Sequence, residues 1–326
     1  MEQNGQLNFS DDPLLAGSNE SFQFLEEGKF LEAVTKLDEL MSINPNYPGL
    51  GEGYRTARFW NNREKEINNL DQGKQTADFL MIQWMEFENY AEENHMKYSM
   101  AYHSAMKYIF FTASEHYKIA FRSQDSSTDN FDLLLNLGIC FLILEEYNSA
   151  IETLEYARSI HKNSARLLSM LGEAYYHTGE MSKGLLYLKE AFLINPSEID
   201  ISALKSKPIL ELIKIVHSSK PDCNDPREWM PIFGFVKELF NARRQLNRDQ
   251  VEVLKRDIRS LEKSFQTLSK ERIYNSNIIP RLANKYLWML EYFRYQEYDS
   301  TNIKEIKERL IQIDGEIFEI YFMDTQ

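Results

Sequence analysis

Residues 131–164 read FDLLLNLGICFLILEEYNSAIETLEYARSIHKNS, and residues 165–198 read ARLLSMLGEAYYHTGEMSKGLLYLKEAFLINPSE. Aligned without a gap, the two stretches place Gly138 over Gly172 and Leu154 over Leu188, at a period of 34 residues. A self-similar period of this length is typical of a protein built from stacked units, each too small to bury its own apolar face.

Each copy contains two amphipathic segments. Apolar residues recur three or four positions apart, and the pattern breaks near Glu145 in the first copy and near Gly179 in the second, which predicts two short helices per copy. Gly138 and Gly172 lie in mid-helix, where glycine costs about 1 kcal/mol relative to alanine. Their presence predicts that another helix approaches there too closely for a side chain.

The period and the residue types resemble the tetratricopeptide (TPR) repeat. The second copy carries the resemblance at Leu171, Gly172, Tyr175, Gly184, Leu188, Ala191 and Pro196. Both copies have leucine, Leu134 and Leu168, where the family commonly has tryptophan, and Lys162 replaces the first copy's proline. The resemblance implies an all-α fold, an α-solenoid of helix–turn–helix repeats with a concave face that binds partners.

The rest of the chain extends this organisation. Few prolines and glycines, 9 and 13 in 326 residues, favour helix. We expect a disordered N-terminal tail at 1–13, a degenerate TPR-like helical region at 14–130, two tandem repeats at 131–198, capping helices and a linker at 199–224, and a C-terminal helical module at 225–326. The proline-rich stretch 218–231 is the expected boundary.

Two parts of this plan are less regular. The stretch from Lys74 to Phe121 has neither proline nor glycine, which predicts one long helix or a broken pair, with its aromatic residues and methionines forming core. Residues 199–215 are expected to form one or two capping helices, interrupted at Pro208.

The C-terminal module has two coiled-coil-like seams. Apolar residues alternate at spacings of three and four along 251–268 and again along 303–320, with a third apolar helix between the two. The three helices are predicted to form an antiparallel bundle. The same seams also allow assembly of a homo-oligomer.

Charge excludes some classes of partner. The net charge is −13, and residues 1–224 carry the whole excess, with 33 acidic against 20 basic residues. Nucleic acid and anionic membranes need a basic surface, so neither is an expected partner. The longest near-apolar run, Leu133–Leu144, is too short to span a bilayer, and with two cysteines and no secretory signal the chain is interpreted as cytoplasmic.

No motif indicates catalysis. Only His95 has a carboxylate three residues before it, in Glu92–His95, and Cys140 lies among apolar neighbours that predict a buried thiol. His177 lacks a nucleophile beside it in the sequence. We therefore predict no enzymatic activity, no metal and no cofactor.

The resemblance implies which side chains line the partner-binding groove. These are Asp132, Leu135, Asn136, Ile139 and Leu142 from the first copy, and Arg166, Ser169, Met170, Glu173, Tyr176 and His177 from the second. One wall is apolar and the other polar, which suits an amphipathic helix or an extended segment with one apolar anchor. The alternative is that these residues contact only the neighbouring helix within 97–121.

A specialised mode of the family clamps a partner's terminal carboxylate. Asn136 and Arg166 fall at two of the positions that this mode uses, but Met170 replaces a needed basic residue, so a co-chaperone role is the less favoured prediction. The favoured hypothesis is a non-enzymatic adaptor or scaffold that binds a protein or peptide segment in a TPR groove. The alternative is a structural homo-oligomer assembled through 251–268 and 303–320.

Overall fold

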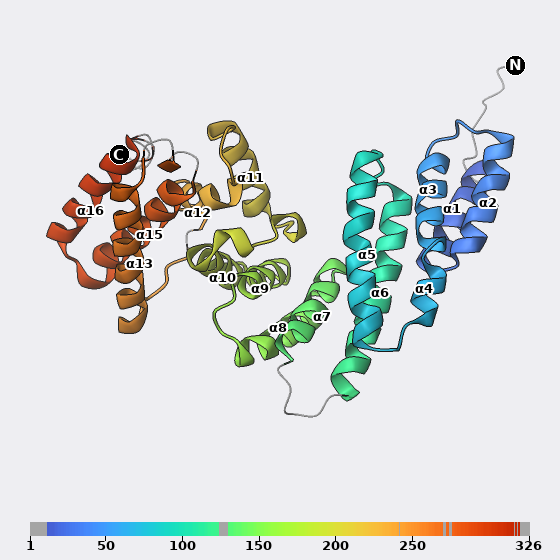
Figure 1. Cartoon of the computed structure of the whole chain (residues 1–326), viewed down its shortest axis with the longest axis horizontal. Coiled ribbons are helices and arrows are strands. Elements are labelled where there is room, and N and C mark those ends of the chain that lie inside the picture. Colours follow the sequence, from blue (N-terminus) through green and yellow to red (C-terminus); the bar gives the residue numbers. More distant parts are fainter. Residues whose placement is uncertain are drawn as a thin grey trace, which may run out of the picture. The chain divides into compact units, whose positions relative to one another are not determined.

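The computed structural model describes residues 12–123, 130–240, 242–269, 272–273, 276–315, 317 and 319. Within these ranges all regular structure is helical, without a strand, which confirms the predicted all-α class (Figure 1). The chain divides into two compact units between Glu146 and Tyr147. This division falls inside the expected repeat 131–164, and the domain limits inferred from the sequence stay predictions.

The first unit contains α1 (Pro13–Glu26), α2 (Phe30–Ile43), α3 (Leu50–Asn61), α4 (Glu64–Asn69), α5 (Lys74–Glu93), α6 (Met100–Ser123) and α7 (Phe131–Ile143). α1 packs on α2 and α6, α3 packs on α2 and α6, and α6 also packs on α5 and α7. The side chain of Asp12 accepts the Leu14 N–H at 2.9 Å and begins α1 at Pro13. Most of the expected tail, residues 1–11, lies outside the described residues.

Aromatic rings fill the core of the first unit. Trp84 lies 5.2 Å from Phe110 and 5.1 Å from Tyr102 between ring centroids, and Trp60 lies 5.5 Å from Phe87. All five are buried, as expected for aromatics at helical spacing. The apolar residues of the stretch from Lys74 to Phe121 do not all lie in the core, because the side chains of Ile82, Met85 and Phe111 are exposed.

The stretch from Lys74 to Phe121 is a broken helix pair. Between α5 and α6, His95 and Tyr98 adopt the left-handed backbone conformation, with φ of 55° and 69°. The Met96 N–H donates to the Ala91 carbonyl at 2.7 Å, a Schellman-type bond that closes α5, and the Met96 side chain is fully buried. A buried methionine therefore fixes a turn that contains neither glycine nor proline.

The second unit contains α8 (Tyr147–Ile160), α9 (Ala165–His177), α10 (Met181–Ile194), the 3₁₀ turns η2 (Pro196–Glu198) and η3 (Ile201–Ala203), α11 (Lys207–Ser219), α12 (Pro226–Val236), α13 (Arg248–Thr267), α15 (Ile278–Tyr292), the π-helical turn η4 (Phe293–Glu297) and α16 (Ser300–Ile313). α9 packs on α8 and α10, and α15 packs on α10, α12, α13 and α16.

The chain between α10 and α11 differs from the prediction. Residues 199–206, here called the strap, were expected to be helical, but Ile199, Leu204 and Ser206 have extended backbone angles and only η3 forms a turn between them. Pro208 lies in the first turn of α11, where a missing N–H costs nothing, so it begins this helix rather than interrupting one.

α9 and α10 cross at two glycines. A Cβ atom added to Gly172 would lie 2.9 Å from the Gly184 carbonyl oxygen, and one added to Gly184 would lie 2.7 Å from the Gly172 carbonyl oxygen. Backbone therefore approaches backbone at this crossing, and the close packing predicted at Gly172 is confirmed.

The C-terminal seams face the core of their own unit. Val251, Leu254 and Ile258 of α13 and Ile306 and Leu310 of α16 are buried together with α15. Leu261, Phe265, Ile303 and Ile313 are partly buried against the same cluster. Ile320, the last residue of the predicted second seam, lies outside the described residues.

A buried ion pair joins α10 to α15. Lys189 Nζ lies 2.7 and 2.8 Å from the two carboxylate oxygens of Glu291, and it also donates to the Ala242 carbonyl at 3.0 Å. The two side chains are 5% and 11% exposed. Asn284 and Lys285 of α15 donate to the Phe192 and Leu193 carbonyls near the end of α10. The second repeat and the C-terminal helices thus share one compact unit, and the predicted boundary at 218–231 does not coincide with the division at 146.

Gly172→Ala should destabilise the chain by about 1–3 kcal/mol, because the added methyl meets backbone atoms that have to move. Gly51→Ala on α3 is the matched control. Its nearest neighbour would be the tip of Arg55 at 3.9 Å, so this change should stabilise by about 0.5–1 kcal/mol. Denaturant unfolding of both variants measures the difference. Equal stabilities would disprove the close crossing.

Lys189→Met should cost about 3–5 kcal/mol, because it leaves the Glu291 carboxylate buried without its counter-charge. The double variant Lys189→Met, Glu291→Leu removes both charges and should recover most of this loss. A double-mutant cycle by chemical denaturation measures the coupling. Additive effects of the two single changes would show that the pair is not coupled.

Candidate functional site

The groove residues expected on α7 are mostly covered. Leu135, Ile139 and Leu142 are buried, and Asp132 is exposed. The Asn136 amide is half-buried and donates to the Tyr117 hydroxyl of α6 at 3.3 Å. Asn136 therefore contacts a helix of its own chain, as the alternative interpretation of these residues predicts.

The groove residues expected on α9 form a polar row with a buried middle. Ser169, Met170 and Glu173 are buried, Arg166 is exposed, and Tyr176 is half-buried. Ser169 Oγ donates to the Arg166 carbonyl of its own helix at 2.8 Å. Because Met170 is buried and apolar, α9 offers no second basic group beside Arg166 for a carboxylate clamp.

Glu173 is the centre of this row. Its side chain is 2% exposed, and Oε1 lies 2.9 Å from His177 Nε2, one helical turn further along α9. The imidazole ring of His177 stacks on the Tyr147 ring, with 4.7 Å between centroids and 11° between planes. The stacked ring and the carboxylate hold His177 in one orientation at the end of α9.

The same carboxylate binds the strap. The backbone N–H of Lys205 donates to Glu173 Oε1, in a short contact of 2.5 Å. Beside this bond, Leu204 is 2% exposed and Ser206 is fully buried. An expected groove residue of α9 therefore receives the main chain of an extended segment.

The site where the strap contacts Glu173 of α9, here called the seat of the strap, contains buried polar atoms that could accept or donate further hydrogen bonds. No donor among the described residues reaches Glu173 Oε2, and Ser206 Oγ likewise has no partner among them. Buried polar atoms in native proteins nearly always have partners, so two such atoms on adjoining elements mark a place where another polar group can bind.

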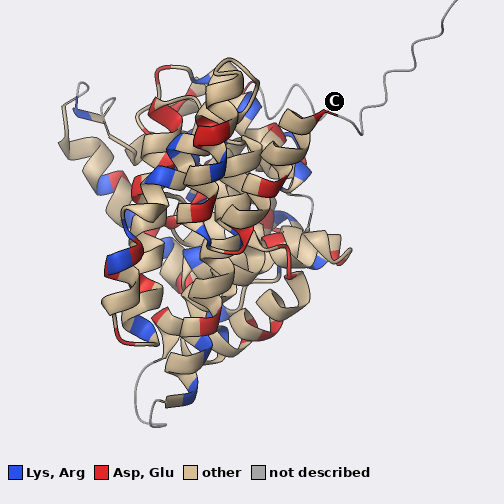
Figure 2. Cartoon of the chain, turned by 90° about the vertical axis from the view of Figure 1, so that its right-hand side faces the viewer, with Lys and Arg blue, Asp and Glu red and all other residues tan. Residues whose placement is uncertain are grey.

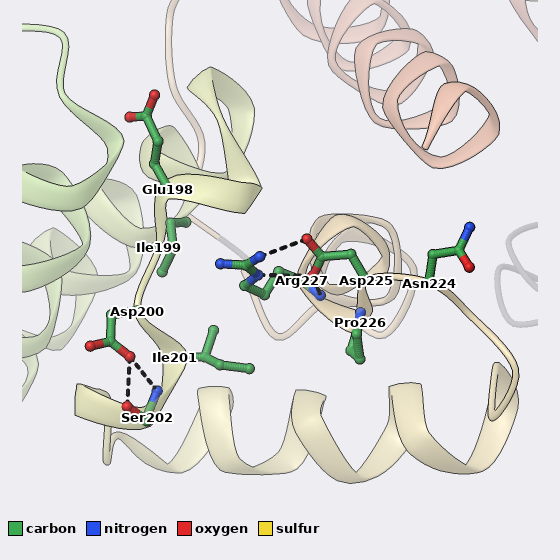
Figure 3. Close-up of a pocket in the computed structure, with 9 residues that line it drawn as sticks. All are labelled: Glu198, Ile199, Asp200, Ile201, Ser202, Asn224, Asp225, Pro226 and Arg227. Atoms are coloured by element: carbon green, nitrogen blue, oxygen red, sulfur yellow. Dashed lines mark hydrogen bonds and ion pairs between the residues drawn. The ribbon is translucent and has the colours of Figure 1, made fainter. Parts of the chain in front are cut away.

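An open hollow of about 550 Å³ borders the strap (Figure 3). Residues 198–202 line it on one side and residues 224–227 on the other. The guanidinium of Arg227 is already committed, since it donates to both Asp225 oxygens at 2.8 Å and to the Ser197 carbonyl at 2.6 Å. The Asp200 carboxylate accepts from Ser202, so it holds the turn η3.

The surroundings of Cys140 and His116, two other candidate groups, favour a structural role for each. Burial raises the pKa of the Cys140 thiol well above its ordinary value, which leaves it protonated and unreactive. Burial lowers the pKa of His116, whose Nδ1 accepts the Gly73 N–H at 3.1 Å. No group of three or more metal-binding side chains comes together within the described ranges.

Charge is mixed along the helices. Figure 2 shows acidic and basic residues interspersed on the visible helices. Across the described part of the chain, no helix has both the length and the apolar character needed to cross a bilayer.

The sequence did not reveal the strap as a ligand of Glu173. Pro208 was a usable signal for the end of the strap, because proline is favoured in the first turn of a helix and so predicts that a helix begins there. Comparisons of the chain with models of protein families, with curated proteins and with solved structures find no match.

Proposed function

We propose that this chain is a non-enzymatic adaptor whose TPR-type repeats bind a segment of a partner protein. The observation that carries the proposal is the hydrogen bond from the Lys205 N–H to Glu173. At a position that the family uses for partners, a buried carboxylate already accepts the main chain of an extended segment. A partner segment can be bound by the same chemistry.

The α9–α10 hairpin supports the repeat assignment. Its crossing at Gly172 and Gly184 is as close as the aligned glycines predict. Arg166 and Tyr176 remain accessible on the same helix as Glu173, so a partner can contact α9 at both ends of the buried row.

The homo-oligomer is less well supported. Most seam residues of α13 and α16 are already buried or partly buried against α15, which leaves little apolar seam for a second copy. The carboxylate clamp also lacks support, because Asn136 is bound to Tyr117 and Met170 is buried.

Site-specific cross-linking tests the proposal. A photo-reactive amino acid at Arg166 or Tyr176 should capture a discrete protein from the source lysate, with the cross-link mapped to one short segment of that protein. The same group at Glu152, an exposed position on α8, is the control. Identical products from all three positions, or none from the two α9 positions, would contradict partner binding on α9.

A further inference from the structure

We infer that the strap is an intramolecular stand-in for the partner, and that a basic, extended partner segment displaces it from Glu173. The inference rests on the proposed function and adds its regulation and the chemistry of the partner. It starts from the seat that the strap occupies, at a position where the repeat resemblance places a partner.

The strap has the features expected of a bound segment. Its backbone is extended at Leu204, with φ −98° and ψ 124°, and Leu204 is a buried apolar side chain next to the N–H that binds Glu173. A main-chain hydrogen bond beside one buried apolar side chain is a common way to bind an extended segment.

The strap combines buried side chains, at Ile199, Leu204 and Ser206, with few main-chain hydrogen bonds to α9 among the described residues. Its remaining backbone hydrogen bonds, donated by Ile199, Ala203 and Leu204, are to residues three positions earlier in the chain. The bond from Lys205 is therefore its main-chain tie to α9. The hollow of about 550 Å³ lies beside residues 198–202, so this part of the strap borders open space.

The seat can also accept a ligand that makes more hydrogen bonds to Glu173 than the strap makes. Glu173 Oε2 is buried and receives no donor from the described residues, although the strap binds the other oxygen of the same carboxylate. A segment that supplies a backbone N–H and also a lysine or arginine donor satisfies both oxygens.

The strap's own sequence is the probe. A fluorescent peptide with the sequence of residues 199–208, IDISALKSKP, is titrated into the full chain and followed by anisotropy. The wild-type chain should bind it weakly, because the tethered strap competes at a high effective concentration. Lys205→Pro removes the N–H donor, and Leu204 already has the backbone angles that a following proline requires. This variant should bind the peptide at least tenfold more tightly.

Lys205→Ala is the matched control, because it removes the side chain and keeps the N–H. It should bind the peptide at least tenfold more weakly than Lys205→Pro does, because both variants lose the side chain and only Lys205→Pro loses the N–H. Equal affinities for Lys205→Pro and Lys205→Ala would overturn the inference.

Hydrogen exchange of the wild-type chain tests whether the strap opens, without any substitution. Amides of the strap should exchange at least 100-fold faster than those at the centre of α10, because the strap opens without unfolding its unit. Equal exchange would show a fixed structural cap and overturn the inference.

Cross-linking from Arg166 separates the two proposals. Lys205→Pro should raise the yield of the partner adduct several-fold over the wild type. An equal yield in both proteins overturns the stand-in role and leaves partner binding intact. If the peptide binds Lys205→Pro and neither protein gives an adduct, the proposed function fails instead.

Discussion

The approach of backbone to backbone at Gly172 and Gly184 is the constraint on which the second unit depends. Each residue lies where a Cβ would meet the other helix's carbonyl oxygen within 3 Å, so the two helices reach this distance only because both side chains are absent. With α9 and α10 this close, Leu188 is fully buried and α10 still has another face available. That face presents Lys189 to α15.

The link between α10 and α15 explains why the repeat does not end as an independent module. A buried lysine and glutamate lose solvation, which only close pairing and further hydrogen bonds offset. Lys189 has both, since it binds Glu291 through two oxygens and also donates to the Ala242 carbonyl, with the Trp288 ring 5.1 Å away. The side chains of Asn284 and Lys285 add to this contact by donating hydrogen bonds to carbonyls in the last turn of α10. The boundary at 218–231, inferred from its prolines, stays a prediction; within it, Pro226 begins α12 and Pro231 lies inside that helix.

Helix type and position were predictable where periodicity and glycine carry the information. The 34-residue period anticipated α9 and α10, and the cost of glycine in a helix anticipated the crossing at Gly172. Two features depend on partners distant in sequence and left no local pattern, namely the pair Lys189–Glu291 and the bond from Lys205 to Glu173. The turn at Met96 is local, but it has neither glycine nor proline to mark it. Of the expected site residues, the structure accounts for Glu173 and His177 as one hydrogen-bonded pair, whereas the burial of Leu135, Ile139 and Met170 could not be deduced from the family positions alone.

Glu173 joins the fold to the proposed function. A carboxylate buried to this degree is stable only if its surroundings supply donors, and here they come from His177 on the same helix and from the main chain of the strap. Both donors bind Oε1, and no donor among the described residues reaches Oε2. Burying Oε2 without a hydrogen bond therefore costs free energy. A residue chosen only to fix the strap would need one acceptor, which serine or asparagine provides without a buried charge. Under the proposed function, a partner segment that supplies this missing donor satisfies the second carboxylate oxygen, so the seat of the strap is where we expect such a segment to gain most by binding.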